Sequence, residues 1–444
     1  MNVRSVALDL LIEIEKNKAF SNIVLNKAID ENRFKAVDAG LLTEIVYGTL
    51  QRKLTLDYYL SKFVQKKIDL WVRNLLRLSL YQMIYLDKIP AHAILNEAVE
   101  IAKQRGHAGI ASFVNGVLRN VQRQGIADLT EIEDPAEQLA TATSHPLWLV
   151  EKWVAELGFE ETKLVCEANL KAPIQTARVN TFKSDRDQVL ALLAEEGFKA
   201  TASHILPECI ENERGNLAFS GAHRDGLITI QDVSSMLVAN VLAPESGERI
   251  LDACAAPGGK ATHLLEKLNG TGEVFALDIH RHKLKLVEKA AKRLGLQGLQ
   301  MKQLDARKAA DDFPENSFDR ILVDAPCSGF GVLRRKPEAK YEKTAQDIAR
   351  LSDIQLDILD KVSGLLKPAG TLVYSTCTIN KNENEQVVAK FLENHPEFEA
   401  DTAMIQRLPE EIRPYVKDAG LQLLPHHIDS DGFFITVLRK RGSQ

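Results

Sequence analysis

Cysteine is scarce in this chain and long apolar runs are absent, and each deficit excludes a class of protein. The five cysteines among 444 residues are too few and too scattered for a disulfide scaffold, and none forms the CxxC pair typical of a zinc site. We therefore expect reduced thiols and no bound metal. No stretch approaches about 18 uninterrupted apolar residues, and the first residues are polar and charged. Neither a membrane span nor a secretory signal is predicted, and we expect a cytoplasmic protein.

The charge of the chain is unevenly distributed. With 45% hydrophobic and 26% charged residues, the composition is that of a folded protein, and the length predicts two to four domains. The formal net charge is -5, yet residues 1–125 hold 18 Lys and Arg against 12 Asp and Glu. A basic N-terminal part suggests a nucleic-acid partner. A solvated charged surface explains the charge alone equally well.

The first 130 residues are predicted to form an all-α domain. Apolar residues recur at helical spacing over 3–14, and the run 75–84 is apolar on almost every side, which predicts a central buried helix. Pro90 stands where the next helix, 91–103, is expected to begin. We therefore assign residues 1–130 to one helical domain.

Two shorter regions follow the helical domain. Residues 131–146 are rich in Asp, Glu and Thr and show little apolar periodicity, so we interpret them as a linker. Residues 147–235 mix expected helices at 148–156 and 187–196 with a strand-like segment at 176–181. This pattern predicts a small α+β module.

Residues 236–444 alternate between strands and helices. Strands are expected in the segments RILDAC, EVFALD, LQMKQLD, FDRILVDAP, TLVYST and FFITVLR, and helices at 260–268, 281–295, 346–366 and 383–393. The alternation predicts a doubly wound, Rossmann-like α/β domain with a mostly parallel sheet. In such sheets ligands bind beyond the carboxyl ends of the strands.

The loop after the first of these strands is the first candidate for a ligand site. It runs over 253–260 and contains Pro257, Gly258 and Gly259, whose small residues let the backbone approach a ligand closely. A Walker A loop would need glycine at 254 and Ser or Thr at 261, but these positions hold Cys254 and Ala261. The GxGxxG pattern of dinucleotide sites is also missing. Phosphate-bearing cofactors are therefore disfavoured.

Three successive strands carry an aspartate at the same edge of the predicted sheet. Asp278 lies 20 residues after Gly258, where a carboxylate accepts hydrogen bonds from ribose hydroxyls. Asp305 and Asp324 end the next two strands. One such aspartate is more often a helix N-cap, but three at one crevice favour a ligand with a ribose, an amine and a positive charge. The cofactor that fits this description without a phosphate is S-adenosylmethionine (SAM).

Two cysteines fall at neighbouring strand ends beside this predicted cofactor site. Cys327 follows Asp324 by three residues, and Cys377 ends the next strand. A thiol beside SAM suits methylation of a pyrimidine at C5, because C5 becomes nucleophilic only after a nucleophile adds to C6. Asp324 is positioned to hydrogen-bond a cytosine at N3. Lys260 either adds positive charge there or is a surface lysine on the first helical turn, and the residues alone do not say which thiol attacks.

Four motifs resemble a known family at these residues. DACAAPGGKATHL, ALDIHRHKL, DAPCSGFGVLRRKPE and YSTCTINKNENE are similar to the SAM-dependent RNA cytosine-5 methyltransferases of the NOL/NOP/Sun type. The resemblance implies that Cys377 is the nucleophile and that Cys327 assists product release. It implies that the SAM contacts are Cys254, Ala255, Ala256, Pro257, Gly258, Gly259, Lys260, Asp278, Asp305 and Asp324. The segment DGFF, Asp431 to Phe434, also resembles a family motif near the substrate, although an ordinary strand start explains it too.

The N-terminal half carries its own resemblance. AVDAGLLTEIVYGTL, IPAHAILNEAVEIAK and FVNGVLRN are similar to the NusB-type RNA-binding domain, and RVNT at 178–181 agrees with a ferredoxin-like or RRM-like module. A NusB-like domain joined to a Sun-type catalytic domain resembles bacterial enzymes that methylate 16S ribosomal RNA. The resemblance covers almost the whole chain and implies 16S rRNA as the partner.

Two alternatives stay open at this point. The first is a NusB-like RNA-binding or antitermination factor with a vestigial methyltransferase domain. Both thiols and the full loop are intact, which argues against it. Failure of the protein to bind SAM would support it. The same chemistry on tRNA is disfavoured only by the resemblance of the N-terminal domain, and on DNA by the motif assignment of Cys377. No heptad repeat argues for a coiled-coil dimer, so we expect a monomer.

Overall fold

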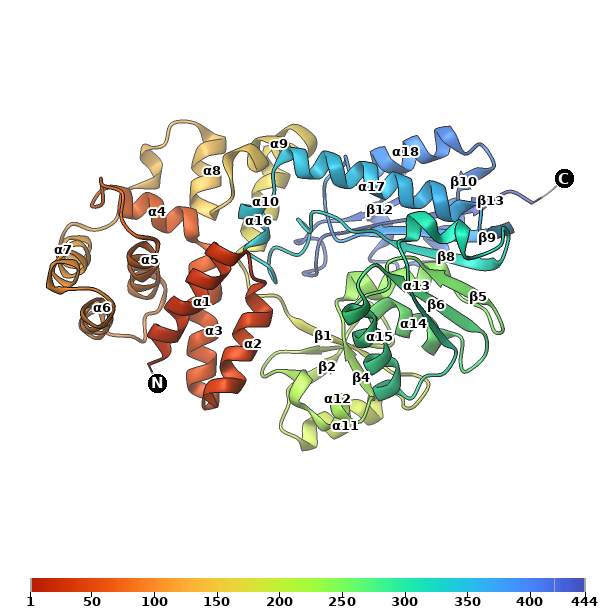
Figure 1. Cartoon of the computed structure of the whole chain (residues 1–444), viewed down its shortest axis with the longest axis horizontal. Helices are drawn as coiled ribbons and strands as arrows, with labels where there is room; N and C mark the ends of the chain where they lie inside the picture. Colours follow the sequence, from red (N-terminus) through yellow and green to blue (C-terminus); the bar gives the residue numbers. More distant parts are fainter. Residues whose placement is uncertain (1, 419, 443–444) are drawn as a thin grey trace. The chain divides into compact units, whose positions relative to one another are not determined.

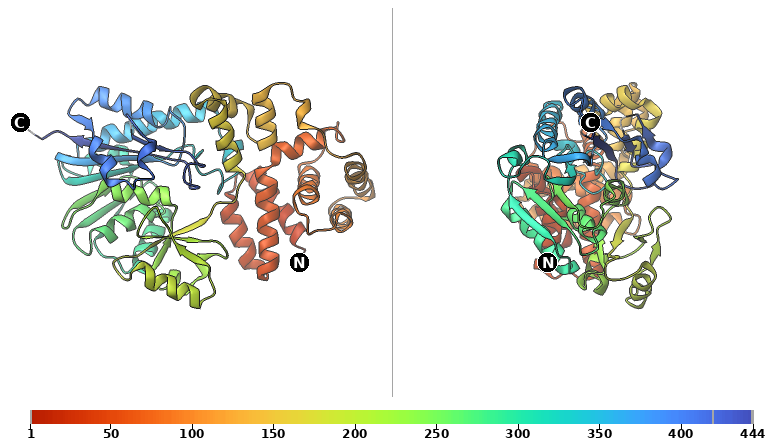
Figure 2. Two further views of the ribbon diagram at one scale, coloured as in Figure 1. Left: turned by 180° about the vertical axis from the view of Figure 1, so that it is seen from behind. Right: turned by 90° about the vertical axis from the view of Figure 1, so that its right-hand side faces the viewer.

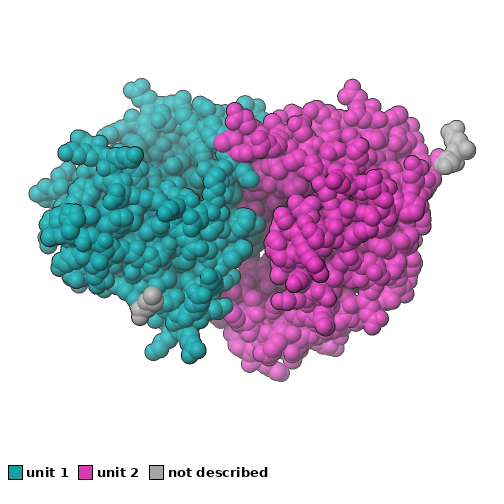
Figure 3. Space-filling view, in the orientation of Figure 1, with its two compact units in different colours: residues 1–172, 333–343 teal, residues 173–332, 344–444 magenta. Residues whose placement is uncertain are grey.

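The computed structural model describes residues 2–418 and 420–442 (Figure 1). Met1, where the predicted helical domain begins, and residues 443–444, where the predicted catalytic domain ends, lie outside the described residues, as does Ala419. The chain divides into two compact units, coloured separately in Figure 3. The first unit comprises Met1–Ala172 with Leu333–Lys343, and the second comprises Pro173–Val332 with Thr344–Gln444. In the described part of the chain, every helix is too short or too polar to cross a membrane.

The N-terminal part of the first unit is all-helical, as predicted. Its helices are α1 (Val3–Asn17), α2 (Ser21–Asn32), α3 (Ala36–Gln51), α4 (Lys53–Ser61), α5 (Leu70–Tyr85), α6 (Ala91–Arg105) and α7 (Ala108–Gln124). Helix α5 is the buried central helix, because Leu75, Leu76 and Leu80 have no exposed surface. Pro90 directly precedes α6, where its fixed backbone angle suits a helix start.

The segment 131–146, which we interpreted as a linker, contains a helix. Helix α8 (Pro135–Thr143) begins after Asp134, whose side chain accepts a hydrogen bond from the backbone N–H of Glu137. It is followed by α9 (Leu147–Leu157), close to the predicted helix, and α10 (Phe159–Asn169). The apolar signal of α8 is weak because so short a helix buries only Leu139, Ala140 and Thr143.

The segment Leu333–Lys343 leaves the second unit in sequence but packs within the first. It contains the short helix α16 (Ala339–Glu342). Ser21 donates from its hydroxyl to the Glu338 carboxylate at 2.8 Å, and Lys340 donates to the carbonyl of Gln51 at 2.9 Å. Lys340 has no exposed surface. Buried polar contacts therefore hold the segment 333–343 within the first unit.

The second unit begins at Pro173 with the strands of the predicted α+β module, whereas α9 and α10, which fall within its predicted bounds of 147–235, belong to the first unit. The strands of the module form an antiparallel sheet in the order β2-β3-β1-β4, with helix α11 between β1 and β2 along the chain. The bounds are β1 (Gln175–Val179), α11 (Arg186–Glu195), β2 (Ala200–Ala202), β3 (Cys209–Asn212), α12 (Gly221–Arg224) and β4 (Ile228–Ile230). The short apolar core includes Val179, Val189 and Ile210.

The rest of the second unit is a mixed sheet in the order β11-β12-β13-β9-β8-β5-β6-β7, with β10 paired to β13. Strands β5 to β9 are parallel, whereas β13 runs antiparallel to β9. The strands are β5 (Arg249–Asp252), β6 (Glu273–Asp278), β7 (Leu299–Gln303), β8 (Phe318–Asp324), β9 (Leu366–Thr376), β10 (Phe398–Ala400), β11 (Val416–Lys417), β12 (Gly420–Leu423) and β13 (Phe433–Lys440). The helices are α13 (Val233–Leu242), α14 (Gly259–Lys267), α15 (Arg281–Leu294), α17 (Ala345–Ser363) and α18 (Glu385–Asn394).

Helices cover both faces of this sheet (Figures 1 and 2). Ile250 packs into the core formed with α13 and α14, whereas its neighbour Leu251 packs into the core formed with α17 and α18. Successive residues of a strand point to opposite faces, so these short strands are apolar on both sides. The doubly wound architecture is the one that the sequence predicts. It brings the carboxyl ends of the parallel strands to one edge, where Asp324 pairs in register with Ser375.

Candidate active site

The two thiols predicted at neighbouring strand ends lie side by side. The Sγ atoms of Cys327, after β8, and Cys377, after β9, are 3.3 Å apart. Because β8 and β9 are parallel neighbours in the sheet, the loops that leave them start at the same edge. Both side chains are partly buried. A substrate atom bound beside one sulfur would therefore lie close to the other as well.

A buried carboxylate joins the loops that carry the thiols. Glu383 has no exposed surface and accepts hydrogen bonds from the backbone N–H of Ser328 at 2.7 Å and from its hydroxyl at 2.5 Å. On the other loop, Asn380 donates to the same carboxylate at 2.7 Å and Thr378 at 3.4 Å. Gln355 of α17 donates a further bond at 3.2 Å. Glu383, which sequence reasoning did not single out, therefore takes hydrogen bonds from both loops and helps to set their separation.

Close backbone contacts place the DGFF segment next to the loops that carry Cys327 and Cys377. The N–H of Gly331 donates to the carbonyl of Cys377 at 2.9 Å, and the N–H of Gly432 donates to the carbonyl of Gly331 at 2.8 Å. A Cβ atom at Gly331 would lie 1.8 Å from the Gly432 oxygen, so only glycine fits. The DGFF segment therefore lies beside the thiols, in agreement with the expectation from its motif.

Electrostatics keep one of the thiols protonated. The hydrogen bond with Cys377, then burial, raises the pKa of the Cys327 thiol well above its ordinary value, and the Glu383 charge acts in the same direction. A thiolate is the reactive nucleophile, whereas a protonated thiol is a hydrogen-bond donor. Cys327 is thus suited to remain protonated and to donate a hydrogen bond.

Lys260 and Asp324 form an ion pair at this edge of the sheet. The Lys260 Nζ lies 2.7 Å from one Asp324 oxygen, and the hydroxyl of Ser375 donates to the other at 2.9 Å. Burial alone would lower the pKa of Lys260, but the Asp324 carboxylate outweighs it and the pKa is raised. The Nζ also lies 5.0 Å from the centre of the Phe433 ring. Lys260 is therefore a charged group of the site, and the alternative of an exposed surface lysine is wrong.

The predicted cofactor loop lies between β5 and α14. Gly258 has φ 112°, and a Cβ there would lie 2.9 Å from the backbone of Val287 on α15, so this position requires glycine. The peptide bond between Ala256 and Pro257 is cis. At the start of the loop, the backbone N–H of Cys254 donates to Asp252 at 3.3 Å.

Asp252 is a site residue that our sequence reasoning missed. It is fully buried at the end of β5, and its Oδ2 atom has no hydrogen-bond partner among the residues that the structure describes. Burial, followed by repulsion from Asp324, raises the pKa of its carboxyl to about 7. An orphaned buried oxygen normally indicates an absent partner. The signal was present in the sequence, because Asp252 ends its strand as Asp278 and Asp324 end theirs.

The remaining two predicted aspartates have local partners. The Asp278 carboxylate accepts from the backbone N–H of His280 at 2.7 Å. Asp305 accepts from the guanidinium of Arg307 at 2.6 Å, which holds the pKa of that carboxyl below its ordinary range. Both carboxylates still affect the cofactor loop, because they raise the pKa of its thiol, Cys254. After burial, it is the carboxylates at this edge that raise the pKa of the Cys254 thiol, and they are Asp252, Asp324, Asp278 and Asp305.

The carboxylates at this edge of the sheet fit a ligand that carries a positive charge and several hydrogen-bond donors. Four carboxylates lie close enough to the loop to raise the pKa of Cys254, and within the described residues one of their oxygens, Oδ2 of Asp252, lacks a hydrogen-bond partner. Phosphate would be repelled by this field, whereas a sulfonium or ammonium group would be attracted. Ribose hydroxyls would satisfy acceptor oxygens. The residues present therefore fit SAM.

Comparison with known proteins covers the whole chain. A family model described as 16S rRNA methyltransferase RsmB/F matches residues 239–439. A protein of Bacillus subtilis (strain 168) named "Probable ribosomal RNA small subunit methyltransferase B" is 52% identical over 443 residues, which are 99% of each chain. The chain belongs to the RsmB/F methyltransferase family. This confirms the family that the motifs indicated.

Further matches agree with the three-part architecture of an RsmB/F methyltransferase. The NusB family matches residues 1–123, and an RsmF/B-like ferredoxin-like domain matches 145–215. "Ribosomal RNA small subunit methyltransferase B" of Klebsiella pneumoniae subsp. pneumoniae is 36% identical, with 99% of each chain covered. The crystal structure of PH0851 superposes with a TM-score of 0.85 at 27% identity, again over 99% of both chains. The predicted fold class, a NusB-like domain, a ferredoxin-like module and a Rossmann-like methyltransferase domain, is confirmed.

Proposed function

We propose that this protein uses SAM to methylate C5 of one cytosine in 16S rRNA through a covalent cysteine adduct. The observation that carries the proposal is the pair of sulfurs 3.3 Å apart, at the strand edge that also holds Lys260 and Asp324. Family membership and the names of the relatives support an rRNA substrate. C5 methylation needs a nucleophile at C6, and a thiol is suited to that addition.

The cofactor would be held by the loop after β5 and by the strand-end carboxylates. The proposed contacts are Cys254, Ala255, Ala256, Pro257, Gly258, Gly259, Lys260, Asp278, Asp305 and Asp324, with Asp252 added from the structure. SAM supplies an electrophilic methyl group when bound. Asp278 is the proposed partner of the ribose, because it follows the second strand of the nucleotide-binding half. Asp252 would receive a donor at its orphaned oxygen.

The first chemical step is the addition of Cys377 to the base. The thiol loses its proton as the sulfur bonds to C6, the electrons of the C5–C6 double bond move into the C4–C5 bond, and those of the N3–C4 double bond move to N3, which takes up a proton through Asp324. This gives an enamine whose C5 is nucleophilic. Asp324 and Lys260 form the polar pair that would hydrogen-bond the cytosine edge, and the raised pKa of Lys260 keeps it charged as a hydrogen-bond donor. C5 then takes the methyl group.

Release of the product requires elimination. A base takes the C5 proton, the electrons of that bond re-form the C5–C6 double bond, and the carbon–sulfur bond breaks with its electron pair on the Cys377 sulfur. Cys327 is hydrogen-bonded to that sulfur, and its protonated thiol stabilises the departing thiolate. We assign Cys377 as nucleophile and Cys327 as the residue that assists release.

The substrate base must leave its stack to reach the thiols. Extrusion costs a few kcal/mol and costs least where the base is unpaired, so a loop cytosine is the expected target. The NusB-like domain and the ferredoxin-like module are the proposed contacts for the surrounding RNA, through phosphates and shape. We propose a cytoplasmic monomer without metal.

The test is methyl transfer from radiolabelled SAM to 16S rRNA with the purified full-length protein. Wild type is expected to transfer label, and Cys377→Ala to transfer none and form no adduct. Cys327→Ala is expected to accumulate a protein–RNA adduct that survives a denaturing gel. Adducts with Cys377→Ala but not with Cys327→Ala would reverse the assignment. Failure of wild type to bind SAM in calorimetry would instead revive the RNA-binding factor with a vestigial domain.

A further inference from the structure

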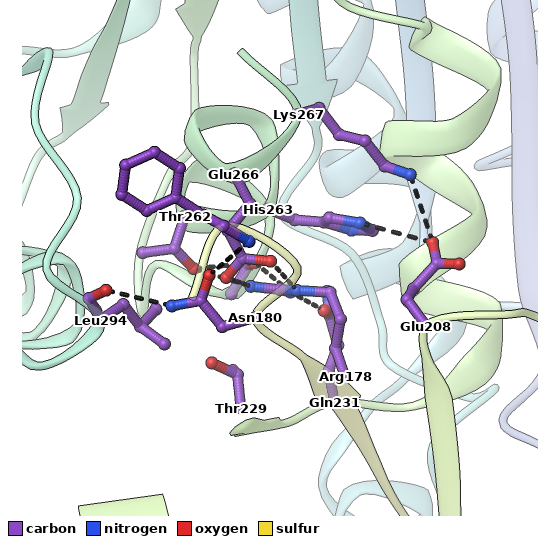
Figure 4. Close-up of polar contacts among 12 residues, drawn as sticks. Arg178, Asn180, Glu208, Thr229, Gln231, Thr262, His263, Glu266, Lys267 and Leu294 are labelled. Atoms are coloured by element: carbon purple, nitrogen blue, oxygen red, sulfur yellow. Dashed lines mark hydrogen bonds and ion pairs between the residues drawn. The ribbon is translucent and has the colours of Figure 1, made fainter. Parts of the chain in front are cut away.

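A buried arginine connects the ferredoxin-like module to the helix that follows the cofactor loop (Figure 4). Arg178 lies on β1 and has no exposed surface. Its Nε donates to Oε2 of Glu266 at 2.7 Å, and a terminal nitrogen donates to Oε1 at 2.8 Å. Glu266 lies on α14 and is itself buried. The two side chains form the two-pronged pairing that only arginine provides.

The same guanidinium reaches the cofactor loop itself. It donates to the backbone carbonyl of Gly259 at 3.0 Å and to the hydroxyl of Thr262 at 3.3 Å. The Thr262 hydroxyl donates in turn to the carbonyl of Gly258 at 2.8 Å. Both glycine carbonyls are therefore fixed by side-chain donors, one of which comes from the module. A hydrogen bond to Gln231 completes the set around Arg178.

Holding the module in place does not by itself require this pair. Burying two charges costs desolvation that their attraction often fails to recover, and apolar residues of similar volume frequently hold an interface equally well. Other polar contacts join the same two parts without touching the loop. Glu208 lies 3.4 Å from Lys267, and Asn180 donates to the carbonyl of Leu294 at 3.0 Å (Figure 4). What distinguishes Arg178 is its direct bond to Gly259.

We propose that Arg178 is a positioning residue for the cofactor loop. Through Glu266 and the Gly259 carbonyl it sets where the loop backbone lies, so the module that we assign to RNA contact also shapes the SAM site. The inference rests on the proposed function, because it requires that this loop binds SAM. A loop whose backbone is held by side-chain hydrogen bonds is pre-organised, and removing the Arg178 bond to Gly259 is expected to weaken SAM binding.

The decisive variant removes the pair without leaving a lone buried charge. The double substitution Arg178→Met with Glu266→Leu keeps apolar volume at both positions and deletes the donor to Gly259. We expect a melting temperature close to that of wild type and a SAM dissociation constant raised at least about tenfold, measured by calorimetry on the full-length protein. The matched control is Glu208→Gln, which loosens the same interface beside Lys267. That control is expected to bind SAM within about twofold of wild type.

Arg178→Lys provides a second measurement that keeps the buried charge balanced. A lysine cannot bind both Glu266 oxygens and the Gly259 carbonyl at once. We expect a raised KM for SAM with kcat recovered at saturating SAM, and faster amide hydrogen exchange at Gly258 and Gly259. A purely structural role would lower kcat through lost active protein and leave KM unchanged.

The outcomes separate this inference from the proposed function. If wild type binds SAM and both Arg178 variants bind it within about twofold of wild type, the positioning role is wrong and the proposed function stands. If Glu208→Gln weakens SAM binding as much as the Arg178 variants do, the effect belongs to the interface and the positioning role is again wrong. If wild type fails to bind SAM, the proposed function itself is contradicted.

Discussion

The carboxylate of Glu383 holds Ser328 by two hydrogen bonds, from its backbone N–H at 2.7 Å and from its hydroxyl at 2.5 Å. Ser328 is the residue after Cys327, and the other donors to Glu383 include residues of the Cys377 loop. No cation accompanies this fully buried carboxylate among its hydrogen-bond partners in the described residues. Glu383 lies six residues after Cys377, in the same YSTCTINKNENE motif, and its carboxylate links the Cys377 loop to the loop that carries Cys327.

Glu383→Gln is expected to impair methyl transfer although glutamine has nearly the same size as glutamate. Glutamine has one acceptor oxygen, so an amide N–H group would face the donors of Ser328 or Asn380 without a partner. We expect a loss of about 1–3 kcal/mol in unfolding free energy and at least about a tenfold fall in kcat. The control is Glu393→Gln, an exposed residue of α18, the helix that follows Glu383, and it should change neither value. Wild-type activity in Glu383→Gln would show that the loops do not need this residue.

Asp252 is expected to make the ligand-free protein less stable as the pH rises. Because its pKa is about 7 in the folded protein against 3.8 ordinarily, the folded state binds more protons between these values. Its contribution to stability is complete below the lower value and is lost as the pH rises to about 7, by at most about 1.4 kcal/mol per pH unit.

Asp252→Asn is the variant that checks this dependence. It should remove the contribution of Asp252 to the pH dependence of the melting temperature. The melting temperature of the variant relative to that of wild type should therefore increase from pH 4 to pH 7. The same variant should bind SAM at least about tenfold more weakly at pH 8, because the acceptor oxygen and its charge are changed. An unchanged pH slope would contradict the burial argument. Unchanged SAM affinity would remove Asp252 from the cofactor site.

The contribution of Lys340 to folding stability is expected to depend on pH in the opposite direction to that of Asp252. Burial lowers its pKa to about 7 from 10.5, so the unfolded chain binds more protons between these values and the contribution of Lys340 rises with pH. The melting temperature of wild type relative to Lys340→Met should therefore increase from pH 7 to pH 10. Lys336→Met, on the same segment, is the comparison for general effects of lost charge. A difference that stays constant with pH would contradict a depressed pKa.

The sequence predicted much of this architecture because strand ends and helix starts leave local signals. The apolar strands and the aspartates after them identify one sheet edge, and the motifs identify the thiols. Glu383 and Arg178 were missed as site residues because their partners are distant in sequence, 55 residues away for Ser328 and 88 for Glu266. Neither contact has a periodicity or a spacing that a single sequence reveals.

Two structural features were missed for a different reason. Helix α8 buries only one narrow face, so its apolar pattern resembles that of a polar loop. The segment 333–343 packs in the first unit although it belongs in sequence to the catalytic part. Its charged residues, such as Glu338 and Lys340, read as exposed until the tertiary contacts are known.

The central claim is that Cys377 forms a covalent adduct with one cytosine of 16S rRNA. The most direct measurement is bisulfite sequencing of small-subunit rRNA from cells that lack this protein, rescued with wild type, Cys377→Ala or no gene. We predict one cytosine that is protected in cells with wild type and unprotected in the other two. Protection restored by Cys377→Ala would contradict the assigned nucleophile, and a methylation map that is identical in all three would contradict 16S rRNA as the substrate.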